Sequence, residues 1–258
     1  MAGSITCNLC SSSVERVHIS KGQYNIYQCD SCGLAFTYPQ PESIDEQYNS
    51  SYFDLYRKRR QFRLNRGNER LKKIELLMEP GRLLDIGCSL GYFVEAAQIR
   101  GWKSSGIEIS PYASEEARNL GLDVRTGVLE DAKYPNASFD CITMWDVLEH
   151  VPDPTAHMLD VHRILSPGGL VVIGTPNLEH LQFKLHRENW RHLKPAEHIF
   201  YFQSASIYHL LKKTGFEVVQ PPMFGGRNFP GSLSAAVKCA FSRMIQLNDV
   251  ITVYGRAV

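Results

Sequence analysis

From residue 82 onward, the hydrophobic pattern alternates between strand-like runs and helix-like periods. Apolar runs typical of buried strands occur at residues 82–86, 105–109, 170–174 and in a segment that begins near Ser138. Between two of these runs, Met158, Val161 and Leu165 repeat at helical spacing. Short turns containing Gly or Pro separate the segments. The alternation predicts an α/β fold with a mainly parallel, doubly wound sheet.

The segment before residue 82 follows a different pattern. Between Arg57 and Lys73 there are nine Lys or Arg residues and one Glu. Apolar Leu71, Ile74 and Met78 keep helical spacing, so we expect an amphipathic helix whose apolar face packs on the core. Its charged face would be solvated, with phosphate binding as the alternative.

Composition narrows the range of functions. The 258 residues are 43% hydrophobic and 21% charged, with a formal net charge of +1. These values are typical of a globular protein and give no overall reason to expect a polyanionic partner. Because we find no secretory leader and no apolar run of membrane-spanning length, we expect a cytoplasmic protein. Its cysteines would then be free thiols or metal ligands.

Four of the seven cysteines lie in two Cys-x2-Cys pairs separated by eighteen residues. The pairs are Cys7 with Cys10 and Cys29 with Cys32. This spacing is typical of four-cysteine structural zinc sites, with redox or disulfide pairs as the alternative. We therefore predict a zinc ribbon over residues 1–40, with short strands at 14–18 and 24–28. Residues 41–80 would form a linker and the basic helix.

A glycine-bearing turn follows the first apolar strand of the α/β region. The sequence Asp85-Ile-Gly-Cys-Ser-Leu-Gly91 leads from that strand into a helix, which brings main chain close to a ligand at the helix start. Glu108 ends the next strand, 23 residues after Asp85, where a carboxylate can accept hydrogen bonds from ribose hydroxyls. The two features together predict binding of a nucleoside cofactor.

Residues 82–175 resemble class I S-adenosylmethionine-dependent methyltransferases. The resemblance rests on the Asp85–Gly91 loop, on Glu108, and on the segments "LEHVPDP" and "LSPGGLVVIGTPN". It implies a seven-stranded Rossmann-like sheet with an antiparallel edge hairpin, in a domain spanning residues 81–258. It assigns cofactor binding to Asp85, Gly87, Cys88, Gly91, Glu108, Leu129 and Trp145. Asp146 would stand at the mouth of the site.

Residues 176–204 form a predicted substrate insert. They include Glu197-His198, followed by Tyr201-Phe-Gln203. This segment is similar to sugar C-methyltransferases that carry an N-terminal zinc domain and a Glu-His pair, although Gln203 stands where those enzymes usually have Ser. The resemblance implies a sugar nucleotide or glycolipid acceptor of a surface-polysaccharide pathway, with His198 moving the proton, Glu197 orienting it, and Asp146 as a further catalytic candidate. Methylation at oxygen or at carbon stays open.

Two other functions remain alternatives. An RNA methyltransferase would use the ribbon and the basic helix, but the near-neutral charge makes nucleic acid an unlikely partner. A non-catalytic cofactor-binding module would be favoured if Ser89, which replaces the usual middle glycine of the loop, weakened cofactor binding. The histidines of the insert could also bind a metal, although their spacing matches no common helical metal motif.

Overall fold

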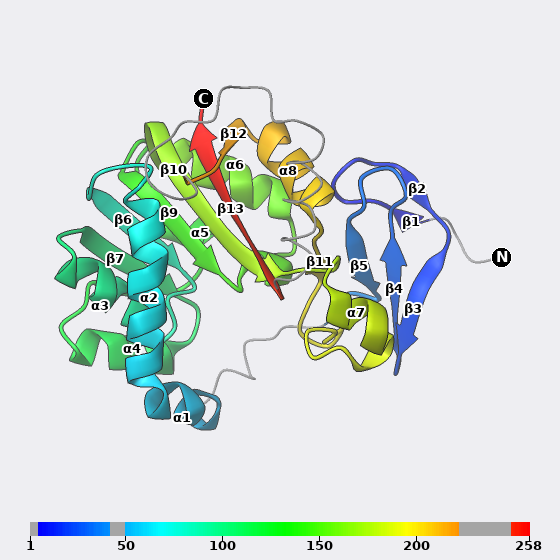
Figure 1. The fold of residues 1–258 in the computed structure, drawn as a ribbon, viewed down its shortest axis with the longest axis horizontal. Helices are drawn as coiled ribbons and strands as arrows, with labels where there is room; N and C mark the ends of the chain where they lie inside the picture. Colours follow the sequence, from blue (N-terminus) through cyan, green and yellow to red (C-terminus); the bar gives the residue numbers. More distant parts are fainter. Residues whose placement is uncertain (1–4, 42–49, 222–248) are drawn as a thin grey trace.

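The computed structural model describes residues 5–41, 50–221 and 249–258. Three features of the sequence lie outside these ranges. They are Tyr48, the first residue of the aromatic run Tyr48, Tyr52, Phe53 and Tyr56; the isolated Cys239; and an amphipathic helix, rich in Ala, Val and Met, that the sequence predicts within residues 223–247. Figure 1 shows an α/β layer structure on one side of the molecule and a small β structure that contains the N-terminal segment on the other.

The main sheet has seven strands in the order β12-β13-β10-β9-β6-β7-β8. The strands are β6 (Arg82–Ile86), β7 (Lys103–Glu108), β8 (Val124–Thr126), β9 (Phe139–Trp145), β10 (Leu165–Pro176), β12 (Phe216–Val219) and β13 (Val250–Ala257). Neighbours from β8 to β10 pair in parallel, whereas β13 is antiparallel to both β10 and β12. This order confirms the predicted fold class, including its antiparallel edge. The chain reverses its winding direction between β6 and β9, which is where such sheets bind ligands.

Helices cover both faces of this sheet (Figure 1). They are α1 (Ser50–Lys58), α2 (Arg60–Ile74), α3 (Tyr92–Ile99), α4 (Pro111–Asn119), α5 (Leu129–Ala132), α6 (Pro154–Ile164) and α8 (Ser204–Lys213), with the short 3-10 turn η2 (Leu148–His150). Helix α7 (Leu181–His186) and the 3-10 turn η3 (Arg187–Asn189) lie instead against the small N-terminal sheet, where Phe183 packs with Ile19 and Ile26 (Figure 1). The buried side chains of α2 and α3 form one core with Leu83, Leu170 and Val172. Those of α6 and α8 form a second core with Leu84 and Ile173.

Local sequence explains where two of these helices begin. The Ser110 hydroxyl accepts a hydrogen bond from the Ala113 amide, and the Asp153 carboxylate accepts bonds from the Thr155 and Ala156 amides. A proline follows each capping residue, and its fixed φ angle suits the first helical position. Both caps lie at the end of the sheet where the cavity described below opens.

The basic segment is divided between two helices, and α2 packs through Leu64, Gly67 and Leu71. Gly67 lies against α3 so closely that a β-carbon there would be 3.2 Å from the Ala96 side chain. Packing on the core therefore confirms the expected apolar face of the helix. No helix in the described part of the chain is long and apolar enough to cross a membrane.

The N-terminal segment forms a four-stranded antiparallel sheet in the order β11-β5-β4-β3 and a separate small hairpin. The sheet strands are β3 (Val17–Lys21), β4 (Tyr24–Gln28), β5 (Ala35–Tyr38) and β11 (Phe200–Tyr201), and the hairpin strands are β1 (Ile5–Thr6) and β2 (Ser13–Val14). The strand expected at 14–18 is thus divided between β2 and β3. Strand β11 comes from the predicted insert, so the insert completes the N-terminal sheet, an arrangement that the sequence did not indicate.

Candidate active site

One large cavity, with a volume of about 990 Å³, opens at the carboxyl ends of the parallel strands. One end is lined by the segments that follow β6, β7 and β9. The other end is lined by residues 191–199 of the insert. Helix α1 and one face of α2 also line the cavity, next to the segments that follow β6 and β7, since Phe53 stacks on Tyr112 and Arg60 pairs with Glu95. Every residue assigned to cofactor binding or catalysis from the sequence lines this cavity except Gly91.

The loop after β6 needs its glycines for both conformation and space. Gly87 and Gly91 have φ angles of +69° and +77°, which side chains rarely adopt. A β-carbon at Gly87 would lie 2.4 Å from the side chain of Val147, and one at Gly91 would lie 2.5 Å from Leu122. Gly91 therefore shapes the loop and the start of α3 from behind the cavity wall.

Ser89 adopts the strained conformation that the sequence raised as a question. Its φ angle is +53°, in the left-handed region. Its amide donates a hydrogen bond of 2.8 Å to the Glu108 carboxylate, while its hydroxyl is buried without a partner among the described residues. Strain of this kind persists only where neighbours enforce it, and it gathers at ligand sites.

Glu108 is held rigidly at the end of β7. One carboxylate oxygen accepts the Ser89 amide and the other accepts the Ser110 amide, at 2.8 and 2.9 Å. Its side chain is buried, and this burial raises its pKa, although the amide hydrogen bonds act in the opposite direction. The second lone pairs of the two oxygens remain as acceptors for ligand hydroxyls.

Asp85 lies deeper, beneath the loop. It is 2% exposed and accepts a hydrogen bond of 2.6 Å from the Thr143 hydroxyl. Burial raises the pKa of its carboxyl group to about 7, while Thr143 and Arg70 partly oppose that rise. A carboxyl group with this pKa changes its protonation state readily when a cation binds nearby.

The remaining expected cofactor residues lie around this carboxylate pair. Leu129 is buried and lines the cavity. Cys88 also lines it, but its sulfur would lie 2.5 Å from a β-carbon at Gly106, so its side chain is closely packed in the fold. The Trp145 ring packs on Phe93 at a centroid distance of 5.5 Å. Its other neighbour is Arg70, whose guanidinium carbon lies 3.6 Å from the ring centroid.

Arg70 was overlooked by the sequence reasoning, which treated the basic helix as a whole. Burial lowers its pKa to about 10, and the nearby cations Arg66 and Arg63 act in the same direction. Among the described residues it forms no hydrogen bond or ion pair with a carboxylate. The spacing of Arg63, Arg66 and Arg70, three and four residues apart, already indicates that they share one face of the helix.

At the other end of the cavity, His198 packs edge-on against His150. Their ring centroids are 4.8 Å apart with an interplanar angle of 85°. His198 is 5% exposed, and its Nδ1 atom is buried without a hydrogen-bond partner in the described part of the protein. Burial lowers the pKa of both histidines, and each imidazole is therefore neutral near pH 7.

The structure corrects the role expected for Glu197. Its carboxylate pairs with Lys194 at 2.9 Å instead of with the His198 ring. Its main-chain oxygen lies 2.8 Å from Nδ1 of His150, so the residue orients the other histidine. The cause is a turn at residues 194–198, in which the His198 amide donates a hydrogen bond to the Lys194 carbonyl. This turn directs the side chains of Glu197 and His198 away from each other.

Two acidic residues after β9 contribute differently to this end. Asp146 is exposed at the cavity with a φ angle of +58°, and its amide donates to the Gly174 carbonyl at 2.7 Å. Glu149 is 1% exposed, and burial raises its pKa to about 8. The sequence reasoning did not identify Glu149 as a site residue, although its position shortly after a predicted parallel strand is typical of ligand-binding residues.

Glu149, His150 and His198 form a compact group of polar atoms. One Glu149 oxygen accepts the Thr175 hydroxyl, and the other has no partner in the described residues. A ligand atom from each of the three side chains lies within 4.8 Å of the others, so the group can transfer protons or hold one cation. The other insert histidines, His180, His186 and His192, do not belong to this group, and His180 and His192 both contact Asp249.

The four N-terminal cysteines are close together as free thiols. The Cys7 and Cys32 sulfurs are 3.6 Å apart, and the Cys10 and Cys29 sulfurs are 3.5 Å apart. Tetrahedral zinc with Zn–S bonds near 2.3 Å would place its sulfur ligands about 3.8 Å apart. This donor set therefore fits a zinc ion.

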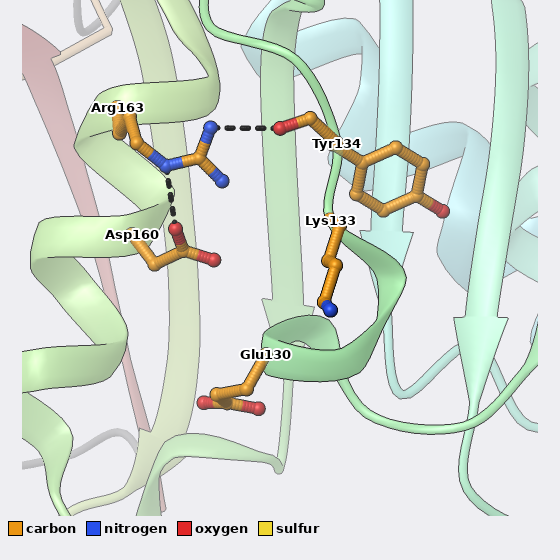
Figure 2. Close-up of a pocket in the computed structure, with 5 residues that line it drawn as sticks. All are labelled: Glu130, Lys133, Tyr134, Asp160 and Arg163. Atoms are coloured by element: carbon orange, nitrogen blue, oxygen red, sulfur yellow. Dashed lines mark hydrogen bonds and ion pairs between the residues drawn. The ribbon is translucent and has the colours of Figure 1, made fainter.

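A second, shallower hollow of about 430 Å³ lies beside α5 and α6 (Figure 2). Within it, Arg163 binds the Asp160 carboxylate and the Tyr134 carbonyl. Glu130 bonds to His157 at 2.8 Å. These polar groups satisfy one another, so we assign this hollow no function.

The strand order, the glycine loop and the amide-bound Glu108 define the class of protein as one with the methyltransferase variant of the Rossmann-like fold. A family model described as a methyltransferase domain matches residues 56–221, which is more than half of the chain. The chain belongs to this methyltransferase domain family.

Similar proteins of known name cover parts of the chain. A ubiquinone biosynthesis O-methyltransferase of Xanthomonas oryzae pv. oryzae is 37% identical over 111 residues, which are 40% of this chain and 46% of that protein. One from Alkalilimnicola ehrlichii is 35% identical over 109 residues, covering 39% and 43%. The alignments thus span less than half the length of these relatives.

Solved structures extend the likeness of fold over most of the chain. A methyltransferase of Thermotoga maritima, described as a possible histamine N-methyltransferase, has a TM-score of 0.57 at 20% identity, covering 80% of this chain and 97% of its own. The magnesium protoporphyrin IX methyltransferase of Synechocystis PCC 6803 has a TM-score of 0.54 at 15% identity, covering 83% and 95%. At these identities the likeness shows the fold alone.

Proposed function

We propose that this protein transfers a methyl group from S-adenosylmethionine to an oxygen of a small-molecule acceptor bound in the 990 Å³ cavity. The observation that carries the proposal is the amide-bound Glu108 carboxylate beside the glycine loop, in the same cavity as a neutral histidine pair. The O-methyltransferases among the relatives support an oxygen acceptor.

The residues around Glu108 would hold the cofactor. Glu108 would accept the two ribose hydroxyls, and Leu129 would pack against the adenine ring. The loop from Gly87 would lie along the methionine portion. Arg70 is positioned to pair with the cofactor carboxylate, because it is a largely buried cation without a carboxylate partner among the described residues. When bound, S-adenosylmethionine supplies an electrophilic methyl group.

The histidine pair would act on the acceptor. His198 would take the proton that an acceptor hydroxyl loses, since its lowered pKa keeps it unprotonated at neutral pH. His150, fixed by the main-chain oxygen of Glu197, would hold the His198 ring in place. Asp146 would stand at the cavity mouth. Aligning the acceptor supplies most of the acceleration in such displacements, and the base adds to it.

We further propose that Cys7, Cys10, Cys29 and Cys32 bind one structural zinc ion, as the distances between their sulfurs support. Four thiolates leave no open position for catalysis. A sugar or glycolipid acceptor remains a prediction from the sequence, and the relatives named for ubiquinone biosynthesis give it no support.

Isothermal titration with S-adenosylhomocysteine tests cofactor binding. Glu108→Ala should weaken binding about ten- to a hundredfold, because each hydrogen bond to a charged group contributes roughly 1.5–3 kcal/mol. Glu115→Ala, on the exposed side of α4, removes the same carboxylate and should bind as the wild type does. Unchanged affinity in Glu108→Ala would reject the cofactor assignment. Labelled methyl transfer into cell extract then tests turnover, and its absence would favour a binding module without activity.

A further inference from the structure

The cations of α2 that line the cavity all lack an ion pair within the described residues. Three cations of α1 and α2 that do not line the cavity form ion pairs: Arg57 with Asp54 and Glu116, Arg60 with Glu95, and Lys72 with Glu69. The three that line the cavity, Arg63, Arg66 and Arg70, form no ion pair with any described residue. Lys58, Arg59 and Lys73 are also unpaired within the described chain, but they are exposed and away from the cavity.

The fold fixes the helix positions of the unpaired arginines. Residues 63, 66 and 70 lie on one face of α2, and the packing of Leu64 and Gly67 fixes the rotation of that helix. Arg63 is further fixed by Tyr56, whose ring centroid lies 3.4 Å from its guanidinium carbon. The Nε atom of Arg63 is buried without a hydrogen-bond partner among the described residues. Buried donors of this kind are costly unless a ligand satisfies them.

The three arginines follow one another along the face of α2 that lines the cavity. Arg70 lies against Trp145, and the carboxylates of Asp146 and Asp85 act on its charge. The cofactor has a single carboxylate, which Arg70 is placed to bind. Arg66 and Arg63 lie about one and two helical turns farther along α2. Arg63 stacks on Tyr56 of α1, and α1 packs through Phe53 on Tyr112 at the start of α4. One cofactor carboxylate cannot pair with all three cations, so Arg66 and Arg63 are left for another anionic group in the same cavity.

Resting on the proposed function, we propose that Arg63 and Arg66 form an anion subsite that binds a phosphate or diphosphate group of the acceptor. Two guanidinium groups supply the paired donors that phosphate oxygens accept, and they balance a doubly charged group. The two other cations of the outer cavity, Arg191 and Lys194, already pair with Asp249 and Glu197. The methyl-accepting oxygen would then lie between this subsite and His198.

Titration with uridine diphosphate tests the subsite in the full-length protein, with and without saturating S-adenosylhomocysteine. We expect binding in both conditions, weakened at least tenfold in the double variant Arg63→Gln, Arg66→Gln. The double variant Lys58→Gln, Arg59→Gln loses the same charge outside the cavity and should bind within twofold of the wild type. The affinity for S-adenosylhomocysteine should be unchanged in both double variants and reduced about tenfold in Arg70→Gln.

Sedimentation with phosphatidylglycerol vesicles separates a lipid phosphate from a nucleotide phosphate. Vesicle binding that depends on Arg63 and Arg66 without nucleotide binding would support the subsite and assign it to a lipid headgroup. The subsite is rejected if neither probe is sensitive to the two arginines, or if S-adenosylhomocysteine displaces uridine diphosphate. If S-adenosylhomocysteine did not bind at all, the cofactor assignment would be rejected instead. The titration with uridine diphosphate alone would still test the anion subsite.

Discussion

The two ends of the cavity satisfy their polar groups in different ways. At the cofactor end, Glu108 is bound by two main-chain amides and Asp85 by a threonine hydroxyl. At the acceptor end, Glu149 and His198 each have a buried polar atom without a partner among the described residues. The cofactor end also has two such atoms, the Ser89 hydroxyl and Trp145 Nε1, but its two carboxylates are held by the fold itself. The acid and the base of the acceptor end, in contrast, depend on a ligand to complete their hydrogen bonds.

The two ends also differ in how the chain builds them. The cofactor end comes from consecutive strand–loop–helix units between residues 82 and 129. The acceptor end combines η2 after β9 with the insert before β11, and the N-terminal sheet supports the insert. Damage to the N-terminal sheet should therefore affect the acceptor end first, and the following variants test this separation.

The largest effect is expected from removal of the cysteine ligands. A structural zinc ion contributes roughly 10–16 kcal/mol to the folding of a small site. Elemental analysis should find about one zinc per chain in the wild type and none in Cys7→Ser, Cys10→Ser. Methyl transfer should fail in that variant while S-adenosylhomocysteine still binds. Cys141→Ala, which changes a buried thiol of the main sheet, should keep its zinc. A metal-free wild type with a disulfide in the cluster would contradict the zinc assignment.

Loss of the proposed base should be nearly as severe for the rate. His198→Ala should lower the rate of methyl transfer about 10²–10⁴-fold without changing the affinity for S-adenosylhomocysteine. The exposed His209→Ala is the matched control. Because the pKa of His198 is lowered, the wild-type rate should hold between pH 7.5 and 6.5, where a histidine of ordinary pKa would lose about half of its base form. Full activity in His198→Ala would transfer the role to His150 or Asp146.

Asp85 gives a smaller effect that depends on pH. Its carboxyl pKa rises from 3.8 to about 7 on folding, so the stability gained by protonation is complete below pH 3.8 and is lost as the pH rises through 7. The shift corresponds to on the order of 4 kcal/mol. Asp85→Asn should therefore be more stable than the cofactor-free wild type at pH 8, and that advantage should disappear toward pH 4. Urea unfolding measures it, with exposed Asp123→Asn as the control. If the difference in stability between Asp85→Asn and the wild type did not change between pH 4 and pH 8, Asp85 would be ionised in the folded protein over that whole range.

The smallest expected effect concerns the link between the N-terminal sheet and the histidine pair. The buried Thr37 hydroxyl donates to the His198 carbonyl at 2.8 Å. Thr37→Val leaves that carbonyl unpaired, so we expect about 1–3 kcal/mol of lost stability and a slower methyl transfer at unchanged cofactor affinity. Thr252→Val, on the exposed side of β13, should change neither quantity. If the methyl-transfer activity of Thr37→Val were unchanged, the hydrogen bond between Thr37 and His198 would serve stability alone.

The residues that the sequence assigned to the cofactor lie together in the structure because the determinants of this region are local. A strand, two glycines with positive φ angles and an acid at the next strand end follow one another within 27 residues, from 82 to 108. The pairing of β11 with β5 and the contact of Arg70 with Trp145 join segments far apart in the chain, and no periodicity reports such contacts. The sequence also led us to pair Glu197 with its neighbour, whereas a turn directed its carboxylate to Lys194.

The pairing of β5 with β11 also orders events during synthesis of the chain. Thr37 and His198 are 161 residues apart, so the β5 edge of the N-terminal sheet emerges from the ribosome long before its partner strand exists. Until residues 200 and 201 arrive, the buried side chains of Ala35 and Phe36 lie on an open strand edge, the kind of edge to which other chains add. A nascent chain stalled before residue 200 would therefore be prone to aggregate, even though its thiol cluster is complete from residue 32.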